Sequence, residues 1–283
     1  ANIVAILIKP FVGKLHVVWG VRASNMLLEN YDRLARFTFS LSVWLSKFTD
    51  LIIVNSNSGY DYHLAKGYPS DRMVVVPNGI DTDFFTPDLV TRQHQRSAWG
   101  IDKGVKLVGI VGRLDPMKDH RTFLLAVSKV LAKRKEVRFV CVGIGTNEYL
   151  ADLKKYSEKL GVLENIRWEP GQENVENVYN ALDVLVSTSA FGEGFSNTLA
   201  EAMSCGVRCV ATDVGDARRI LSDTGVVVPP GDSSAVADGI LAILDCDERE
   251  HSKFTKLAID HIRKNFSIDQ LVSNTLSLFN NRF

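Results

Sequence analysis

Short apolar runs alternate with helical segments over most of this 283-residue chain, and this alternation restricts the fold more than any other feature. The runs at 106–111, 138–142 and 184–187 are apolar at most positions instead of at every second position. Strands of this kind are buried on both faces, as in a parallel sheet that helices cover on either side. The sequence therefore predicts an α/β fold with parallel sheets.

The alternation occurs in two blocks, which predict two Rossmann-like domains. We expect four parts: a first domain, a linker, a second domain that binds the ligand, and a C-terminal helix; they span residues 1–88, 89–104, 105–265 and 266–283. The first block has about three strand-like runs, fewer than the five or six of an average sheet. We therefore expect the first domain to be incomplete.

Composition excludes several classes of protein. Lysine plus arginine equals aspartate plus glutamate at 33 each, so the basic excess of a nucleic-acid-binding protein is absent. No apolar run reaches the roughly 18 residues of a membrane span. The four cysteines are expected to be free thiols in a reducing compartment. We therefore expect a cytoplasmic protein without a nucleic-acid partner.

A basic cluster near one predicted helix end has two interpretations. Its members are Lys129, Lys133, Arg134, Lys135 and Arg138. The favoured interpretation is a solvated helix face whose cations complement the negative end of the helix dipole. The alternative is contact with anionic lipid head groups, which would place the protein peripherally at the inner face of a membrane.

The first motif that carries chemistry is GRLDPMK at 112–118, directly after the apolar run at 106–111. Gly112 permits a sharp exit from a strand. Arg113 and Lys118 can then converge over the strand end, where ligands bind in parallel sheets. Two cations at such a crevice suit a diphosphate, because arginine gives forked contacts and lysine a point charge. The alternative is a pair of solvated loop cations.

The second motif is FGEGFSNTLAE at 191–201. Its glycines allow close approach of the backbone to a ligand, and the helix that follows presents free N–H groups and a positive dipole end to phosphate. Glu201 lies about one turn inside that helix, where a carboxylate can accept hydrogen bonds from ribose hydroxyls. Glu193 precedes the helix and can face a sugar. The segment between them supplies the other candidate donor-binding residues, Gly194, Phe195, Ser196, Asn197 and Thr198.

Two further patterns carry less information. Gly143-Ile144-Gly145 looks like the start of a dinucleotide fingerprint, but the third glycine is replaced by Glu148. We interpret it as a tight turn from strand to helix, with a secondary role lining a nucleotide pocket as the alternative. His120 follows the cationic loop and is expected to cap or line it, and none of the six histidines is placed convincingly as a general base.

Together these motifs resemble the retaining glycosyltransferases of family 4. The resemblance rests on the loop that ends at Lys118, on the glutamates eight positions apart, and on three further segments, NGID at 78–81, ATDVGD at 211–216 and VPPGD at 228–232. It implies the GT-B fold, in which two Rossmann-like domains face each other across a cleft. The first domain, 1–88, would then lie on the acceptor side, and the helix at 266–283 would pack back toward it.

The resemblance also implies roles. Arg113 and Lys118 would hold the diphosphate of a nucleotide-sugar donor, Glu193 would contact the transferred sugar, and Glu201 would bind the ribose. No metal and no cofactor would be needed, because fixed cations and a helix N-terminus already face the charge that develops on the leaving group. The acceptor would be a glycan or a lipid-linked molecule in polysaccharide biosynthesis.

The chain departs from the family pattern at two points. Arg22 stands where many relatives carry a histidine near the transferred sugar, and is a candidate sugar-side residue. The chain also opens in what reads as a helix midway through the first domain. Two alternatives to a transferase therefore remain: a module that binds nucleotide sugar without turnover, and a GT-B-fold nucleotide-sugar epimerase.

Overall fold

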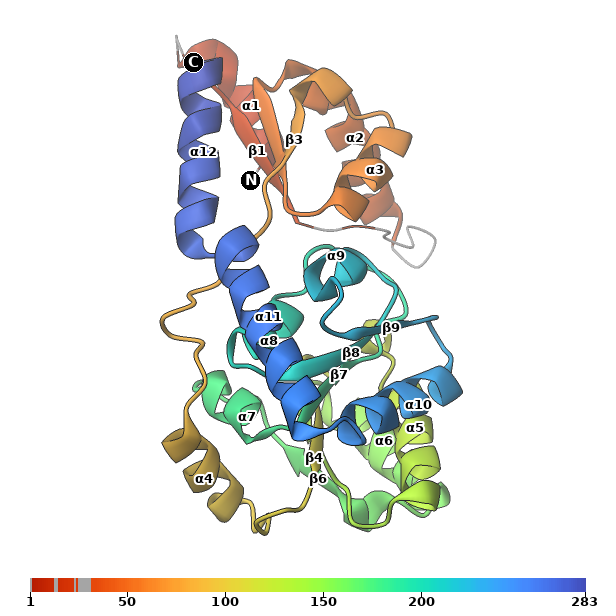
Figure 1. The fold of residues 1–283 in the computed structure, drawn as a ribbon. Coiled ribbons are helices and arrows are strands. Elements are labelled where there is room, and N and C mark those ends of the chain that lie inside the picture. The colour runs from red at the N-terminus through yellow and green to blue at the C-terminus, as the bar shows by residue number, and fades with distance from the viewer. Residues whose placement is uncertain (1, 13–14, 23, 25–31) are drawn as a thin grey trace.

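The computed structural model describes residues 2–12, 15–22, 24 and 32–283. Two α/β units stand one above the other, each built on a parallel sheet (Figure 1). The upper sheet has the strand order β1-β2-β3, and the lower sheet has the order β6-β5-β4-β7-β8-β9. All the strand pairs are parallel. The predicted α/β fold with two Rossmann-like parallel sheets is confirmed.

The first unit is small. Its helices and strands are α1 (Asn2–Ile8), β1 (Val18–Val21), α2 (Arg33–Leu45), β2 (Leu51–Val54), α3 (Asn57–Ala65) and β3 (Met73–Val75). Trp19, Ile52 and Val54 form the centre of one hydrophobic cluster. The first strand of this unit begins at Val18. The backbone N–H of Val17 donates to the carboxylate of Asp50 (2.7 Å) and so takes no part in the sheet ladder.

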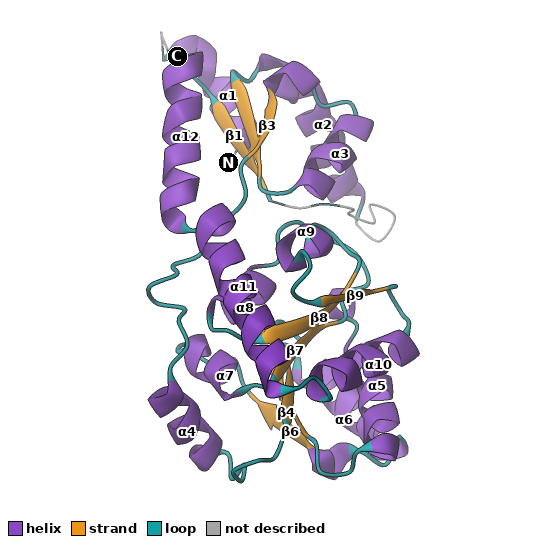
Figure 2. Cartoon of the chain, viewed as in Figure 1, coloured by secondary structure: helices purple, strands orange, loops and turns teal. Residues whose placement is uncertain are grey.

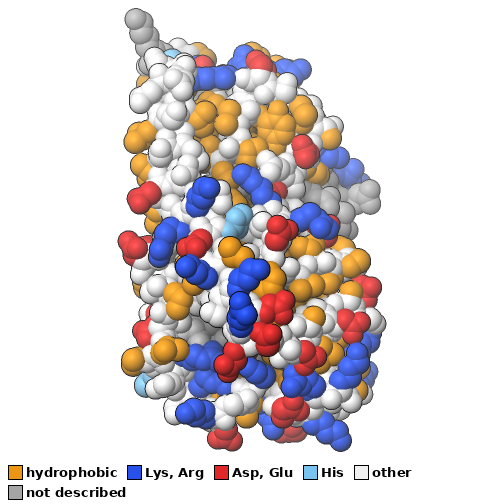
Figure 3. Space-filling view, viewed as in Figure 1, with side chains coloured by type: hydrophobic (Ala, Val, Ile, Leu, Met, Phe, Trp, Pro, Cys, Tyr) orange, Lys and Arg blue, Asp and Glu red, His pale blue; other side chains and the backbone are white. Residues whose placement is uncertain are grey.

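The surface of this unit carries many apolar side chains. Phe11, Leu34, Phe37 and Trp44 are each more than half exposed, and Figure 3 shows hydrophobic side chains on the surface of the upper unit. Phe37 and Trp44 lie two turns apart on α2, so they share the outward face of that helix.

The second unit has six strands. They are β4 (Leu107–Val111), β5 (Arg138–Val142), β6 (Ile166–Glu169), β7 (Val184–Ser187), β8 (Arg208–Thr212) and β9 (Val226–Val228). Side chains of β5 alternate between two cores: Phe139 and Cys141 belong to one cluster, Val140 and Val142 to the other. This two-sided burial is the physical reason for the uninterrupted apolar runs in the sequence.

Helices cover both faces of this sheet (Figure 1). Those whose side chains join one cluster are α5 (His120–Lys133), α6 (Asn147–Lys159) and α10 (Ser233–Leu244). Those of the other cluster are α7 (Val175–Ala181), α8 (Asn197–Ser204), α9 (Ala217–Leu221) and α11 (Glu248–Phe266).

The segment predicted as a linker, 89–104, is mostly helical. It contains α4 (Leu89–Ala98), which packs against α7 of the second unit. The Arg92 guanidinium donates to the carbonyl oxygens of Asn180, Ala181 and Leu182 at the C-terminal end of α7. Since a cation is favourable at the negative end of a helix, these contacts attach the segment to the second unit. The extended stretch between the units therefore lies before α4.

The chain returns to the first unit through α12 (Ile268–Arg282). Ser267 separates α11 from α12 in an extended conformation and caps α12 by accepting from the backbone N–H of Gln270 (3.2 Å). Figure 2 shows α12 beside the upper unit. Arg282 donates to the carbonyl oxygen of Asp71 (2.8 Å), and the Phe283 ring lies 4.2 Å from the His16 ring. The last helix thus packs on the first unit.

The segment that returns the chain to the first unit is hydrogen-bonded to the segment that leaves that unit. The backbone N–H of Ile80 donates to the carbonyl of Phe266 (2.7 Å), and the backbone N–H of Ile268 donates to the carbonyl of Ile80 (3.0 Å). Gly79 makes room for this contact: a Cβ there would lie 2.9 Å from the Cα of Ile268 and 2.9 Å from the Cβ of Leu271.

Candidate functional site

The two predicted ligand-binding segments lie at the centre of the six-stranded sheet. β4 and β7 are neighbours there, and the strand order runs outward from them in opposite directions. Such a switch point opens a crevice beyond the carboxyl ends of the strands. The loops that leave β4 and β7 are bonded to each other: the Thr188 hydroxyl donates to the carbonyls of Lys118 (2.9 Å) and Asp119 (3.0 Å), and the Ala190 N–H donates to the Met117 carbonyl (2.8 Å).

Lys118 and Glu193 meet at this switch point. The Lys118 ammonium donates to Oε1 of Glu193, and both side chains are mostly buried, at 17% and 12% exposed. The hydroxyl of Ser189 donates to the same oxygen (2.7 Å). A partly buried ion pair needs such added hydrogen bonds to offset the loss of water. The second oxygen of Glu193 and two N–H bonds of Lys118 remain for other partners.

Two glycines allow the loops to approach this closely. Gly112 has φ +153°, and the Cε of Lys118 lies 3.6 Å from the position of a Cβ there. Gly192 has φ +77°, and a Cβ would lie 2.7 Å from the Met117 sulfur. A larger residue at position 192 would therefore be strained in its backbone and would also displace Met117.

The segment from Gly194 to Thr198 starts helix α8. The N-cap residue Ser196 makes no side-chain capping bond, so the first N–H groups of α8 are not capped by it. Phe195 is 6% exposed, and its ring lies 5.2 Å from Phe266, so its side chain belongs to the core and only its backbone can face a ligand. Asn197 is exposed and accepts a hydrogen bond from Asn78 of the first unit (2.8 Å).

Glu201 has a partner that the sequence did not reveal. The Tyr179 hydroxyl donates to Oε2 of Glu201 (2.7 Å), and Tyr179 is 1% exposed. Burial raises the pKa of Glu201, and the hydrogen bond from Tyr179 opposes this rise. The bond fixes one carboxylate oxygen and leaves the other to accept from a ligand. Tyr179 and Ser189 are both candidates missed from the sequence, because each becomes recognisable only through its neighbour in space.

The two predicted arginines lie at the periphery. Arg113 is exposed, and its guanidinium lies 3.9 Å from the carboxylate of Asp115. Arg22 is also exposed, and its carbonyl oxygen lies 3.6 Å from the position of a Cβ on Gly194. Arg22 therefore adjoins the β7–α8 loop from the side of the first unit.

His120 lies beneath the cationic loop, as the first residue of α5. It is 1% exposed, and both ring nitrogens lack a hydrogen-bond partner within the described part of the chain. Burial, followed by the nearby positive charge of Lys118, lowers the pKa of His120 to about 4. The imidazole is therefore neutral near pH 7. It does not line the loop as a ligand group; it fills space under it.

The turn Gly143-Ile144-Gly145 supports the loop that follows β4. A Cβ on Gly143 would lie 1.8 Å from the carbonyl oxygen of Gly112, and one on Gly145 would lie 2.5 Å from that of Leu114. The Leu114 N–H donates to the Ile144 carbonyl (2.8 Å). These contacts confirm the predicted tight turn from strand to helix. A cavity of about 290 Å³ adjoins it and also touches Trp168 at the end of β6.

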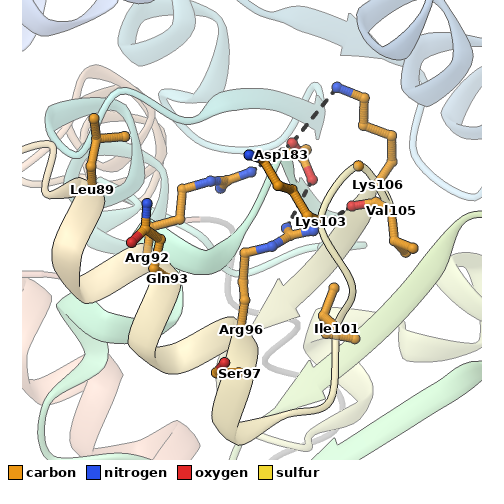
Figure 4. A pocket seen from close by; sticks show the side chains of 11 residues that line it. Leu89, Arg92, Gln93, Arg96, Ser97, Ile101, Lys103, Val105, Lys106 and Asp183 are labelled. Carbon is orange, nitrogen blue, oxygen red and sulfur yellow. Dashed lines mark hydrogen bonds and ion pairs between the residues drawn. The ribbon is translucent and has the colours of Figure 1, made fainter.

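A larger cavity of about 570 Å³ lies at the opposite edge of the second unit, between α4 and the start of β4. Arg92, Arg96 and Lys106 surround the single carboxylate of Asp183 there (Figure 4). Arg96 also donates to the carbonyl of Ala181 (3.0 Å). Because these arginines bind Asp183 and the carbonyl oxygens at the end of α7, their role is to attach α4 to the second unit.

The basic cluster at the end of α5 and in the residues that follow it is largely partnered. Lys129 donates to the hydroxyls of Ser233 (2.8 Å) and Ser234 (2.6 Å), and Lys133 donates to Asp238 (3.1 Å). Arg134 donates to Asp245 (2.9 Å). These contacts join α5 to α10. Contact of this face with anionic lipid stays a prediction.

Comparison with known proteins identifies the family. Residues 91–259 match the sequence model of the glycosyl transferases group 1, and residues 1–84 match that of glycosyltransferase family 4. The first match alone covers more than half of the chain. This chain belongs to the group 1 glycosyltransferases.

Two curated relatives are similar to this chain in sequence. The lipopolysaccharide core biosynthesis mannosyltransferase LpsB of Rhizobium meliloti is 30% identical over 203 residues, which are 69% of this chain and 57% of the relative. The D-inositol 3-phosphate glycosyltransferase of Corynebacterium jeikeium is 33% identical over 256 residues, which are 85% of this chain and 60% of the relative. The chain thus spans less than two thirds of either relative.

Solved structures agree on the fold. The HepE protein of Anabaena, solved in complex with UDP and glucose, superposes with a TM-score of 0.83 at 21% identity, over 97% of this chain and 75% of that one. A glycosyltransferase from Rickettsia africae superposes with a TM-score of 0.77 at 18% identity, over 99% of this chain and 80% of that one. In the described residues of the present chain, the helices are all too short or too polar to cross a bilayer.

Proposed function

We propose that this protein transfers a sugar, with retention of anomeric configuration and without a metal, from a nucleotide-diphosphate sugar to a glycan or lipid-linked acceptor. The observation that carries the proposal is the pairing of Lys118 with Glu193 beside the start of α8. A lysine, a carboxylate and a helix N-terminus meet at the switch point of a parallel sheet. This combination suits a ligand with a diphosphate at one end and hydroxyl groups at the other.

The chemistry follows from where charge develops. When the bond between sugar and diphosphate breaks, negative charge grows on the leaving phosphate oxygens. Lys118 and the first N–H groups of α8 would stabilise that charge more than the charge of the intact donor, and this difference lowers the barrier. Arg113, exposed on the loop that follows β4, would add a forked contact to the diphosphate.

Glu193 and Glu201 would position the two ends of the donor. The oxygen of Glu193 that Lys118 and Ser189 leave free would accept hydrogen bonds from hydroxyls of the transferred sugar. Glu201, held by Tyr179, would accept from the ribose. If the acceptor attacks from the face from which the leaving group departs, the anomeric configuration is retained without a protein nucleophile. Glu193 is therefore given no covalent role.

UDP is the first nucleotide to test, because the structurally similar HepE was solved with UDP and glucose. We expect calorimetry to detect UDP binding that is weakened about tenfold or more by Lys118→Ala and by Glu201→Ala, since a charged hydrogen bond contributes roughly 1.5–3 kcal/mol. Lys133→Ala is the matched control, because Lys133 pairs with Asp238 on the surface of α10. If both site variants bound UDP and the other nucleoside diphosphates as tightly as the unmodified protein, the site assignment would be wrong.

Turnover separates the transferase from its alternatives. In the absence of acceptor, a transferase would slowly hydrolyse a labelled nucleotide sugar, an epimerase would convert it to a second nucleotide sugar, and a binding module would leave it intact. Slow hydrolysis that persists in EDTA supports the proposal. Loss of all hydrolysis in EDTA that returns with a divalent cation would contradict its metal independence.

A further inference from the structure

A carboxylate of the second unit caps a helix of the first. Asp216 follows β8 and is 4% exposed. Its Oδ2 accepts from the backbone N–H of Asn57 (2.9 Å), and its Oδ1 accepts from that of Ser58 (3.0 Å). These are the first two residues of α3. Asp216 therefore bonds with both oxygens across the boundary between the units.

Helix α3 cannot satisfy these donors by itself. The first N–H groups of a helix have no partner within it. The side chain of its own N-cap residue, Ser56, accepts from the backbone N–H of Gly59 (3.0 Å) and so leaves the N–H groups of Asn57 and Ser58 to another acceptor. Asp216 supplies the missing acceptors and places a negative charge at the positive end of the helix dipole. Arg219 lies 3.6 Å from the same carboxylate, which further compensates its burial.

The same turn also holds the loop between β7 and α8. The backbone N–H of Asp216 donates to the carbonyl of Gly194 (3.0 Å). Gly215 has φ +64°, and a Cβ there would lie 2.5 Å from that carbonyl oxygen. On the other side, a Cβ on Gly194 would lie 3.0 Å from the side-chain oxygens of Asn55 and Ser56. The loop at Gly194 is thus enclosed between the turn at 213–216 and the start of α3.

We propose that Asp216 is a positioning residue that holds the first unit closed over the loop at Gly194. Its backbone bonds to the loop and its side chain bonds to the first unit. Asp216 therefore sets the position of the first unit relative to the loop at Gly194. The structural part of this proposal stands on the contacts alone. Its catalytic part rests on the proposed function: closure would place the acceptor-side unit at the donor sugar, and turnover would need it.

Amide hydrogen exchange tests the contact directly in the full chain without ligand. We expect Asp216→Ala to speed exchange of the Asn57 and Ser58 amides about tenfold or more, because they lose a charged acceptor. Asp216→Asn should act in the same direction, since an amide nitrogen would face one of the two donors. The matched control is Asp213→Asn, a change on the same turn at a side chain that pairs with Arg218 (2.6 Å). Exchange within twofold of the unmodified protein in both Asp216 variants would overturn the proposal.

Binding and turnover test the catalytic part. We expect Asp216→Asn to keep its UDP dissociation constant within about twofold, while kcat for hydrolysis of UDP-glucose falls about tenfold. Equal losses in UDP affinity and kcat would mean that Asp216 merely supports the loop, and would overturn the positioning role. If the unmodified protein bound no nucleotide, the proposed function would fail, and the exchange measurement would still decide whether Asp216 holds the units together.

Discussion

The two units of this chain bury their apolar side chains to very different degrees. In the six-stranded unit, residues 139–142 of β5 are all buried, and successive side chains enter the two cores on opposite faces of the sheet. In the three-stranded unit, Phe11 is 86% exposed, Leu34 72% and Phe37 65%. Helices on both faces enclose the core of the second unit, whereas the first unit leaves several large apolar side chains exposed.

The difference shows where sequence changes should matter. Apolar burial contributes about 25 cal/mol per Å² removed from water, so side chains enclosed by the six-stranded sheet carry most of the stability. The open face of the first unit gains little from the same residue types. The first unit is instead held by a few specific contacts to the second, such as those of Asp216 and Ile80.

The sharpest test of this contrast is the same substitution in both units. Phe123 is fully buried on α5, and Phe37 is exposed on α2. We expect Phe123→Ala to lower the free energy of unfolding by about 3–5 kcal/mol and Phe37→Ala to change it by less than about 0.5 kcal/mol. Urea unfolding followed by circular dichroism measures both. Comparable losses in the two variants would mean that the face containing Phe37 is covered in solution.

The second prediction concerns the charge at the centre of the larger unit. We expect Lys118→Ala to lower turnover of a nucleotide sugar about 10²–10³-fold, because one preorganised donor to a developing anion typically contributes that much. It also leaves Glu193 with one hydrogen-bond partner fewer, so thermal melting serves as the control for folding. A loss of less than threefold, with the fold intact, would remove Lys118 from the reaction.

The third prediction is the pH dependence of stability that His120 causes. The pKa of the His120 imidazole is about 4 in the folded chain, whereas that of an unfolded histidine is about 6.5. Between these values the unfolded state binds more protons, so stability falls as the pH falls, by up to about 3 kcal/mol in all. We expect His120→Leu to lose this part of the slope in denaturant titrations from pH 7 to pH 4. An unchanged slope would mean that His120 is hydrated or paired in solution.

The smallest expected effect is that of Tyr179→Phe. Removing the hydroxyl should weaken UDP binding about fivefold at pH 7, which is about 1 kcal/mol for one hydrogen bond. The pKa of Glu201, already raised by burial, should rise further, because the bond from Tyr179 opposes that rise. Binding needs the ionised carboxylate, so the pH below which affinity falls should move upward in the variant. Calorimetry at several pH values measures the shift, and identical profiles would contradict the role of Tyr179.

Much of the second unit could be predicted from the sequence, for a physical reason. Its strands are buried on both faces, so their apolar runs mark them directly, and β5 and β7 have the predicted bounds. The strongly polar sequence of α4 does not predict that this helix packs against the second unit. That packing depends on the contacts of Arg92 with the end of α7. Local patterns predict elements, but contacts between distant segments decide where those elements pack.

The candidate site divides in the same way. Glycines, cations and carboxylates at strand ends pointed to Lys118, Glu193 and Glu201, and the structure brings the first two into contact. Phe195 stays a predicted donor-binding residue through its backbone N–H, since its ring packs on Phe266, 71 positions further along the chain. Ser189 and Tyr179 could not be predicted from the sequence, because neither residue type is unusual in its segment. Their importance comes only from the carboxylates that they contact.

The paired backbone bonds at Ile80 restrict how the two halves can move. The chain passes between them twice, before α4 and again at Ser267, and the two passages are hydrogen-bonded side by side. A single flexible connection would let one half tumble freely about the other. Two connections bonded together permit mainly rotation about one axis through Ile80 and Ser267. Relative motion would then have one principal degree of freedom, with its amplitude greatest in the parts of each unit farthest from that axis.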